Sequence, residues 1–140
     1  MPPSRDSQRM ANPERPLSPH LQVYRWQVQM VTSILHRATG VILVVGSLLV
    51  AWALVALAGG PDSWSTFSGF ARSWFGFLVM FGWTWALAFH LINGVRHLAQ
   101  DAGYAFDIKG TIRNSWISVF GSLLLTAVIW VVAMMQWGNA

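Results

Sequence analysis

The sequence contains no cysteine, and only 10% of its 140 residues are charged. Without cysteine the chain forms no disulfide, ligates no iron–sulfur cluster and supplies no thiolate nucleophile. Soluble domains carry roughly 25% charged residues, so the scarcity of charge argues against a free-standing soluble globule. With 54% hydrophobic residues, the composition indicates that a lipid bilayer is the solvent for most of the chain.

Three long tracts lack Asp, Glu, Lys and Arg altogether: Ala38 to Pro61, Ser73 to Val95, and Asn114 to the C-terminus. A helix needs about 20 apolar residues to cross a hydrocarbon core about 30 Å thick, and each tract is long enough. None shows the strict alternation of a barrel strand. The sequence therefore predicts an all-α membrane protein with three transmembrane helices, over about residues 31–58, 74–98 and 114–137.

The N-terminal region differs in composition from the rest. Its first half is polar and interrupted by prolines, which predicts a tail that buries too little surface to fold. From Leu17 to Gln29 apolar and polar residues alternate, which indicates an interfacial segment or a short strand-like stretch on the membrane. We expect a tail with this segment over 1–30 and a three-helix anchor over 31–140. No apolar signal-peptide core is visible, and Asp6 and Glu14 argue against a mitochondrial transit peptide.

Lys and Arg are distributed unevenly around the three tracts. Eight of the 9 precede the first tract or lie between the second and third, and only Arg72 lies in the first connection. Positive residues are enriched in cytoplasmic loops. The distribution predicts a cytoplasmic N-terminus and an external C-terminus. Together with the argument against a transit peptide, we expect the inner membrane of a bacterium in preference to that of a mitochondrion. Because the basic charge reports topology, it gives no reason to expect nucleic-acid binding.

Basic side chains gather at the predicted cytoplasmic ends of two spans. His36 and Arg37 precede the first tract, and His90, Arg96 and His97 lie at the end of the second. Ionisable groups inside a hydrophobic span are costly and mark functional sites by default. Because the first span leaves the cytoplasmic side and the second returns to it, all of them fall in the same leaflet.

The spacing on the second span suits a haem. His90 and His97 are seven residues apart, so they share one helix face, about 10.5 Å apart along the axis. Haem iron takes an axial histidine, and haem propionates need cationic or hydrogen-bonding partners. Gly94 would let a flat ring approach the backbone. From the spacing alone, a hydrogen bond between helices explains His90 as well as a bond to iron does.

The first span offers a second combination of groups. Ser33, His36 and Arg37 are three or four residues apart and can line one helix face. They supply a hydroxyl, an imidazole and a permanent cation. A quinone head group needs such donors, because its reduction requires protons and stabilisation of charge. The alternative is that His36 and Arg37 only extend to the lipid head groups and set the topology.

Three motifs occur in order along the chain: RPLSPHL at residues 15–21, SILHRATG at 33–40, and HLINGVRHL at 90–98 followed by Asp101. Together they resemble the cytochrome b membrane-anchor subunit of succinate dehydrogenase, respiratory complex II. The match covers nearly the whole chain from Arg15 onward. The ordered combination is more specific than any one motif.

The resemblance implies a non-catalytic subunit of a four-subunit succinate:quinone oxidoreductase. A flavoprotein subunit with FAD would oxidise succinate, and an iron–sulfur subunit would pass the electrons to ubiquinone or menaquinone. This chain would pair with a second membrane-anchor subunit in the lipid bilayer. No succinate-oxidising site is expected in it.

The resemblance also implies roles for individual residues. His90 corresponds to the axial ligand of haem b, which is shared with the second anchor subunit, while Ser33 and Arg37 correspond to quinone-site residues. Four residues match groups near the haem propionates: His36, Arg37, Arg96 and His97. Two alternatives remain, a fumarate reductase anchor with the reverse electron flow and a haem-free structural anchor whose histidines only pack helices.

Overall fold

The computed structural model describes residues 25–104 and 107–137, and four helices make up most of this part of the chain. They are α2 (Val28–Ala58), α3 (Pro61–Arg72), α4 (Trp74–Asp101) and α5 (Ile108–Trp137). No strand occurs among the described residues, in agreement with the predicted all-α class. The expected tail and most of the expected interfacial segment lie outside the described residues.

Three of these helices are long and apolar enough to cross a membrane: α2, α4 and α5, with 31, 28 and 30 residues. Large apolar side chains on them point outward, as Val44 and Leu48 do with exposures of 72% and 70%. Such a surface is suited to hydrocarbon and not to water. The chain is therefore a multi-pass membrane protein, as the charge-free tracts predict.

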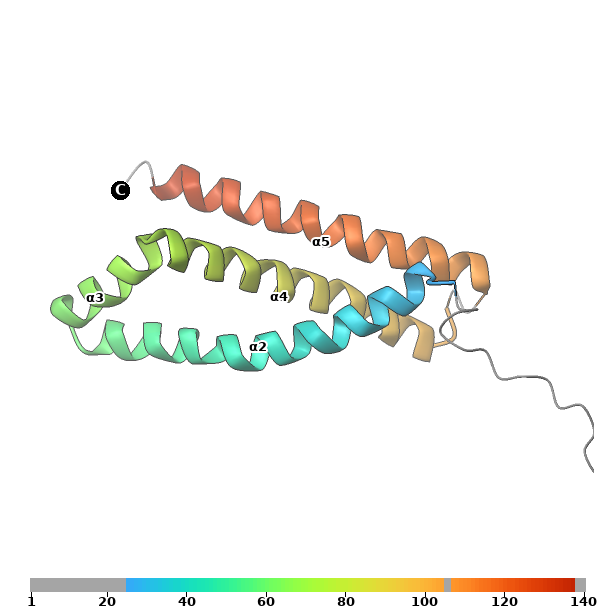
Figure 1. The fold of residues 1–140 in the computed structure, drawn as a ribbon, viewed down its shortest axis with the longest axis horizontal. Coiled ribbons are helices and arrows are strands. Elements are labelled where there is room, and N and C mark those ends of the chain that lie inside the picture. The colour runs from blue at the N-terminus through green and yellow to red at the C-terminus, as the bar shows by residue number, and fades with distance from the viewer. Residues whose placement is uncertain (1–24, 105–106, 138–140) are drawn as a thin grey trace, which may run out of the picture.

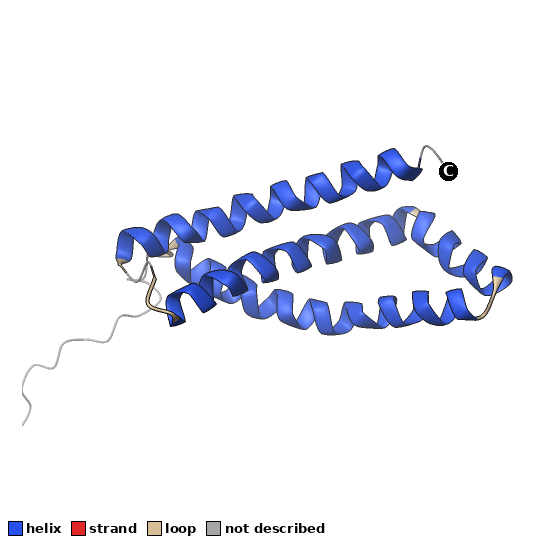
Figure 2. Ribbon diagram, turned by 180° about the vertical axis from the view of Figure 1, so that it is seen from behind, coloured by secondary structure: helices blue, strands red, loops and turns tan. Residues whose placement is uncertain are grey.

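Figures 1 and 2 show α4 lying between α2 and α5, with α3 forming a corner that joins α2 to α4 at one end of the bundle. Successive long helices run in opposite directions. The beginning of α2, the end of α4 and the beginning of α5 therefore meet at the other end. All three pairs of long helices are in contact.

The first connection holds more than the turn that Gly59-Gly60-Pro61-Asp62 predicts, because the 12-residue helix α3 follows. Gly60 adopts φ 90°, where a side chain would be strained, and Pro61 opens the helix. α3 packs against α2 through Phe67, which is buried and meets the Trp52 ring edge-on at 5.1 Å. This contact across the corner stabilises a helix too short to be stable alone.

The interior of the bundle is more polar than its surface. α5 carries a column of hydroxyl side chains that are at most 2% exposed: Ser115, Ser118, Ser122 and Thr126. Each donates a hydrogen bond to a carbonyl of its own helix, so burial leaves no hydroxyl proton unpaired. Small side chains allow close helix contact, and Gly121 in the same region faces Ile92 of α4. Polarity inside and hydrocarbon outside is the arrangement that a bilayer permits.

Candidate functional site

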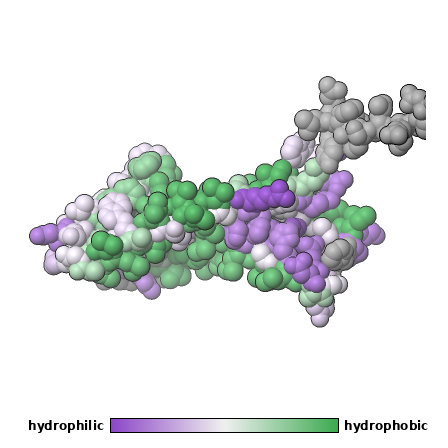
Figure 3. Space-filling model, turned by 90° about the horizontal axis from the view of Figure 1, so that it is seen from below, coloured by the Kyte–Doolittle hydropathy of each residue, from purple (hydrophilic) through white to green (hydrophobic). Residues whose placement is uncertain are grey.

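The basic residues expected to share a leaflet lie at the end of the bundle where α2 begins and α4 ends. Figure 3 shows hydrophilic residues gathered at this end and hydrophobic residues over the middle. The antiparallel course of α2 and α4 brings their segments together although they are far apart in the sequence. The candidate residues come from both helices: Ser33, His36 and Arg37 from α2, and His90, Arg96 and His97 from α4.

His36 lies at the centre of a cluster of three half-buried histidines. Its ring stacks on that of His90, with centroids 4.1 Å apart and planes 12° apart. The ring of His97 is 5.2 Å from that of His36 and tilted by 48°. His36 therefore contacts both histidines of α4, which stand two helical turns apart.

His90 is held by the backbone of α2. Its Nδ1 lies 3.2 Å from the carbonyl oxygen of His36 and 3.3 Å from Oγ1 of Thr39. The Thr39 hydroxyl has carbonyl acceptors of its own at Leu35 and His36. Because a carbonyl oxygen only accepts, we assign the proton of the His90 ring to Nδ1. The other nitrogen, Nε2, then carries the lone pair with which imidazole binds a metal.

Two glycines lie against the histidine pair. A Cβ atom on Gly40 would be 3.2 Å from Cε1 of His90, so the α2 backbone approaches this ring directly. The imidazole of His36 lies beside Gly94, where the sequence predicts that a flat ligand ring can approach the backbone. A Cβ atom on Gly94 would be 3.8 Å from Nε2 of His36, an ordinary van der Waals distance.

Arg96 does not join the histidine cluster. Its side chain is only 8% exposed, and Nη1 donates a 2.6 Å hydrogen bond to Oγ of Ser115 on α5. Six residues along a helix turn a side chain to a different face, so Arg96 meets α5 while His90 meets α2. The structure thus brings His36, His90 and His97 together and places Arg96 at a second interface.

Ser33 and Arg37 border the cluster on α2. Ser33 is half-buried and Arg37 is exposed, whereas the adjacent Thr32 is buried. The Arg37 guanidinium is therefore accessible to a molecule outside the bundle. This position suits a group that acts on a substrate or on another subunit.

Three buried polar residues of this region were missed by the sequence reasoning: Thr32, Thr39 and Asn93, with exposures of 0%, 1% and 0%. Thr39 contacts the His90 ring. Both amide atoms of Asn93 are buried without a hydrogen-bond partner among the described residues. Thr39 and Asn93 each follow a histidine by three residues, so they lie one turn away on a neighbouring part of the helix surface. The signal in the sequence that could have identified Thr39 and Asn93 is a polar residue inside a span, one helical turn from a histidine.

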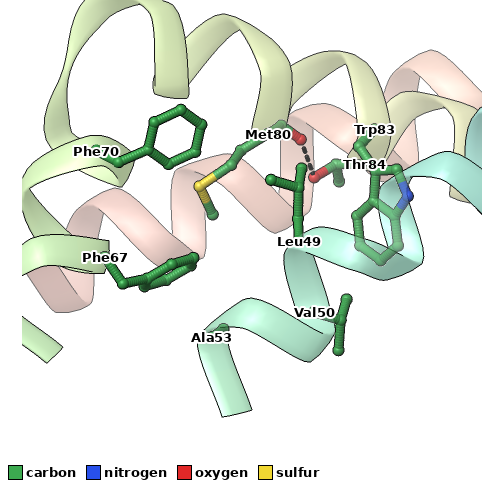
Figure 4. Close-up of a pocket in the computed structure, with 8 residues that line it drawn as sticks. All are labelled: Leu49, Val50, Ala53, Phe67, Phe70, Met80, Trp83 and Thr84. Atoms are coloured by element: carbon green, nitrogen blue, oxygen red, sulfur yellow. Dashed lines mark hydrogen bonds between the residues drawn. The ribbon is translucent and has the colours of Figure 1, made fainter. Parts of the chain in front are cut away.

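Apolar hollows lie toward α3, away from the histidines. Figure 4 shows one of about 200 Å³ in which Phe67 and Phe70 of α3, Leu49 of α2 and Met80 of α4 converge. A wider groove of about 810 Å³ runs between α2 and α4. Trp83 borders both hollows. Their lining is almost entirely apolar, so they suit hydrocarbon and offer little to a polar head group.

Comparison with known proteins extends the sequence resemblance. Residues 11–129 match the family described as the succinate dehydrogenase/fumarate reductase transmembrane subunit. The succinate dehydrogenase cytochrome b556 subunit of Paracoccus denitrificans is 43% identical over 118 residues, which cover 84% of this chain and 91% of the relative.

Two further relatives agree with this match. The cytochrome b556 subunit of succinate dehydrogenase from Rickettsia prowazekii is 40% identical, covering 84% of this chain and 92% of its own. The succinate dehydrogenase cytochrome b560 subunit of Reclinomonas americana is 33% identical, covering 86% of this chain and 88% of its own. With three membrane-spanning helices and matches over most of its length, the chain belongs to the family of succinate dehydrogenase cytochrome b membrane-anchor subunits.

Proposed function

We propose that this chain supplies one axial ligand to haem b and forms part of the quinone-reduction site of a succinate dehydrogenase. The observation that most directly supports the haem assignment is the 3.2 Å contact between Nδ1 of His90 and the carbonyl oxygen of His36. Metal-binding histidines usually donate their other ring nitrogen to such a partner, which orients the ring and raises its basicity as a ligand. His90 has this second partner, and its ring is only half-buried in the chain alone.

The other histidines are not arranged to complete a metal site with His90. The rings of His36 and His90 are nearly parallel, so their nitrogens do not converge on one ion. Within residues 25–104 and 107–137, no group of three or more His, Cys, Asp or Glu side chains could hold a metal. We therefore assign the second axial histidine to a second anchor subunit packed beside His90. When bound, the haem would supply one-electron redox chemistry.

The quinone site is assigned to Ser33 and Arg37. The Ser33 hydroxyl can donate a hydrogen bond to a quinone carbonyl. The exposed Arg37 guanidinium can stabilise the negative charge that develops on that oxygen as electrons arrive. Both lie on the same turn of α2 as His36, whose imidazole can donate or accept a hydrogen bond beside the quinone.

The propionate partners are assigned from the same end of the bundle. His36 and His97 face each other within the cluster, and Arg37 is exposed beside it. Arg96 was expected among these groups, but its Nη1 is engaged by Ser115. The propionate contacts are assigned to His36, Arg37 and His97, and to the remaining donors of Arg96, whose Nε has no partner among the described residues.

The assembly and its orientation follow from the same assignment. As a succinate dehydrogenase anchor, the chain works in the membrane with other subunits of that enzyme. We assign FAD and the iron–sulfur clusters to a flavoprotein and an iron–sulfur subunit on the cytoplasmic side of a bacterial inner membrane. Electrons would then enter at the histidine end of the bundle, with the N-terminus cytoplasmic and the C-terminus outside.

Replacement of His90 by Leu in the purified complex tests the haem assignment. We expect the haem b signal in the reduced-minus-oxidised spectrum to be strongly reduced, because leucine cannot bind iron. Leu91→Ala is the matched control, since Leu91 is the next residue on α4 and 57% exposed. An unchanged spectrum in the His90→Leu complex would reject the ligand role and favour the haem-free structural anchor.

A further inference from the structure

The Ser115 hydroxyl links all three membrane-spanning helices. It accepts a 2.6 Å hydrogen bond from Nη1 of Arg96 on α4 and lies 3.4 Å from Oγ1 of Thr32 on α2. Its own proton is donated to the carbonyl oxygen of Thr111 on α5, 2.9 Å away. The single proton of Thr32 is shared between Ser115 and the carbonyl oxygen of Gln29, which is 3.1 Å away, so the bond from Arg96 is the stronger of the two links that Ser115 makes to other helices.

This junction lies next to the residues assigned to the quinone and the haem. Thr32 directly precedes Ser33 and stands one turn before His36, on α2. Arg96 directly precedes His97 on α4. α5 itself carries no residue of the candidate site, yet it is bonded at one point to both helices that do.

The junction is also closed to solvent and lipid. Ser115 and Thr32 are 0% exposed and Arg96 is 8% exposed. A guanidinium in such surroundings is costly unless its donors are satisfied, and the Nε of Arg96 already lacks a partner among the described residues. Arg96 therefore has a strong preference for the arrangement in which Ser115 accepts its hydrogen bond.

We propose that Ser115 is a positioning residue for the quinone site: through Thr32 and Arg96 it sets how the first turns of α2 lie against α4. This rests on the proposed quinone role of Ser33 and Arg37. Without the hydroxyl, Arg96 loses a buried acceptor and α2 loses its tie to α5. Ser33 and Arg37 would then be less well aligned for the quinone.

The same face of α5 offers two matched controls. Ser118 and Ser122 are as fully buried as Ser115, but each has a carbonyl of its own helix as partner, Asn114 at 3.1 Å and Val119 at 2.8 Å. Ser118→Ala and Ser122→Ala therefore remove a buried hydroxyl of equal size without breaking a bond to another helix.

The test uses the purified complex with a short-chain quinone and, separately, a soluble artificial electron acceptor. For Ser115→Ala we expect KM for the quinone to rise about threefold or more, with kcat changed less and succinate oxidation by the artificial acceptor retained. Ser118→Ala and Ser122→Ala should stay within about twofold of the parent in both assays. Equal behaviour of all three variants would overturn the proposal.

If the Ser115→Ala complex does not assemble, Thr32→Val provides the test. It removes the contact between α2 and Ser115, together with one hydrogen bond inside α2 to the carbonyl oxygen of Gln29, and leaves the bond between Arg96 and Ser115 in place. It should raise KM for the quinone in the same direction. A Thr32→Val complex that matches Ser118→Ala would overturn the positioning role. A different result would contradict the proposed function itself: unchanged quinone kinetics in both Ser33→Ala and Arg37→Gln would reject the quinone role of these two residues.

Discussion

The imidazole rings of His36 and His90 stack with their centroids 4.1 Å apart, although 54 residues separate them in the sequence. The same pair is joined by the carbonyl oxygen of His36 and Nδ1 of His90. One residue of α2 therefore fixes both the plane and the protonated nitrogen of the proposed haem ligand. Changes that disturb this contact are expected to act on the haem.

Gly40→Ala is expected to disturb the haem ligand from α2. The added methyl group would lie 3.2 Å from Cε1 of His90, closer than most carbon contacts, so the ring must shift. We expect a shifted haem absorption band or midpoint potential, or a lower haem content, in the purified complex. Gly94→Ala is the control, because its methyl group would meet His36 at 3.8 Å. Equal haem spectra and haem contents in the two variants would contradict this expectation.

Gly46→Ala is expected to destabilise the packing of α2 on α4. A Cβ atom at Gly46 would overlap the indole ring of Trp83, so the ring or the helix must move. Overpacking of this kind costs about 1–3 kcal/mol. The thermal denaturation midpoint of the complex should fall. Gly82→Ala is the control, because Gly82 lines the same groove and a Cβ atom there would have nothing within 4 Å. A comparable fall in the denaturation midpoint of that variant would show that the contact with Trp83 is not the cause.

Ser33→Ala and Arg37→Gln are expected to impair quinone reduction while preserving succinate oxidation with a soluble artificial acceptor. Loss of a positioned donor or cation at a developing charge lowers turnover by about tenfold or more. Arg113→Gln is the control, since Arg113 is also exposed and lies near the same end of the bundle. Parallel loss of both activities would indicate failed assembly instead of a damaged quinone site.

Reporter fusions at Gly60 and Asp101 test the orientation. The two residues lie beyond opposite ends of the bundle, after α2 and at the end of α4. Because the positive charge gathers beside Asp101, we expect a cytoplasmic reporter to be active at Asp101 and a periplasmic reporter at Gly60. Activity of the same reporter type at both positions would place Gly60 and Asp101 on one side of the membrane and would contradict the proposal that α4 crosses it between them.

The gross fold was open to prediction from the sequence because hydropathy is a local property. A run of uncharged residues identifies a span whatever its neighbours do, and α2, α4 and α5 contain the three such runs. The helix α3 was not predicted, because its 12 residues owe their order to the contact of Phe67 with Trp52 across the corner.

The sequence by itself determined that the chain crosses a membrane and that its basic residues gather at one end of two spans. Its motifs also named the residues of the candidate site. Only the tertiary structure decided that His36 stacks on His90, that Arg96 turns to Ser115, and that buried hydroxyls line the interior. The reason is geometric: these contacts depend on how each helix is rotated and displaced against its neighbours, and that follows from packing along the whole interface.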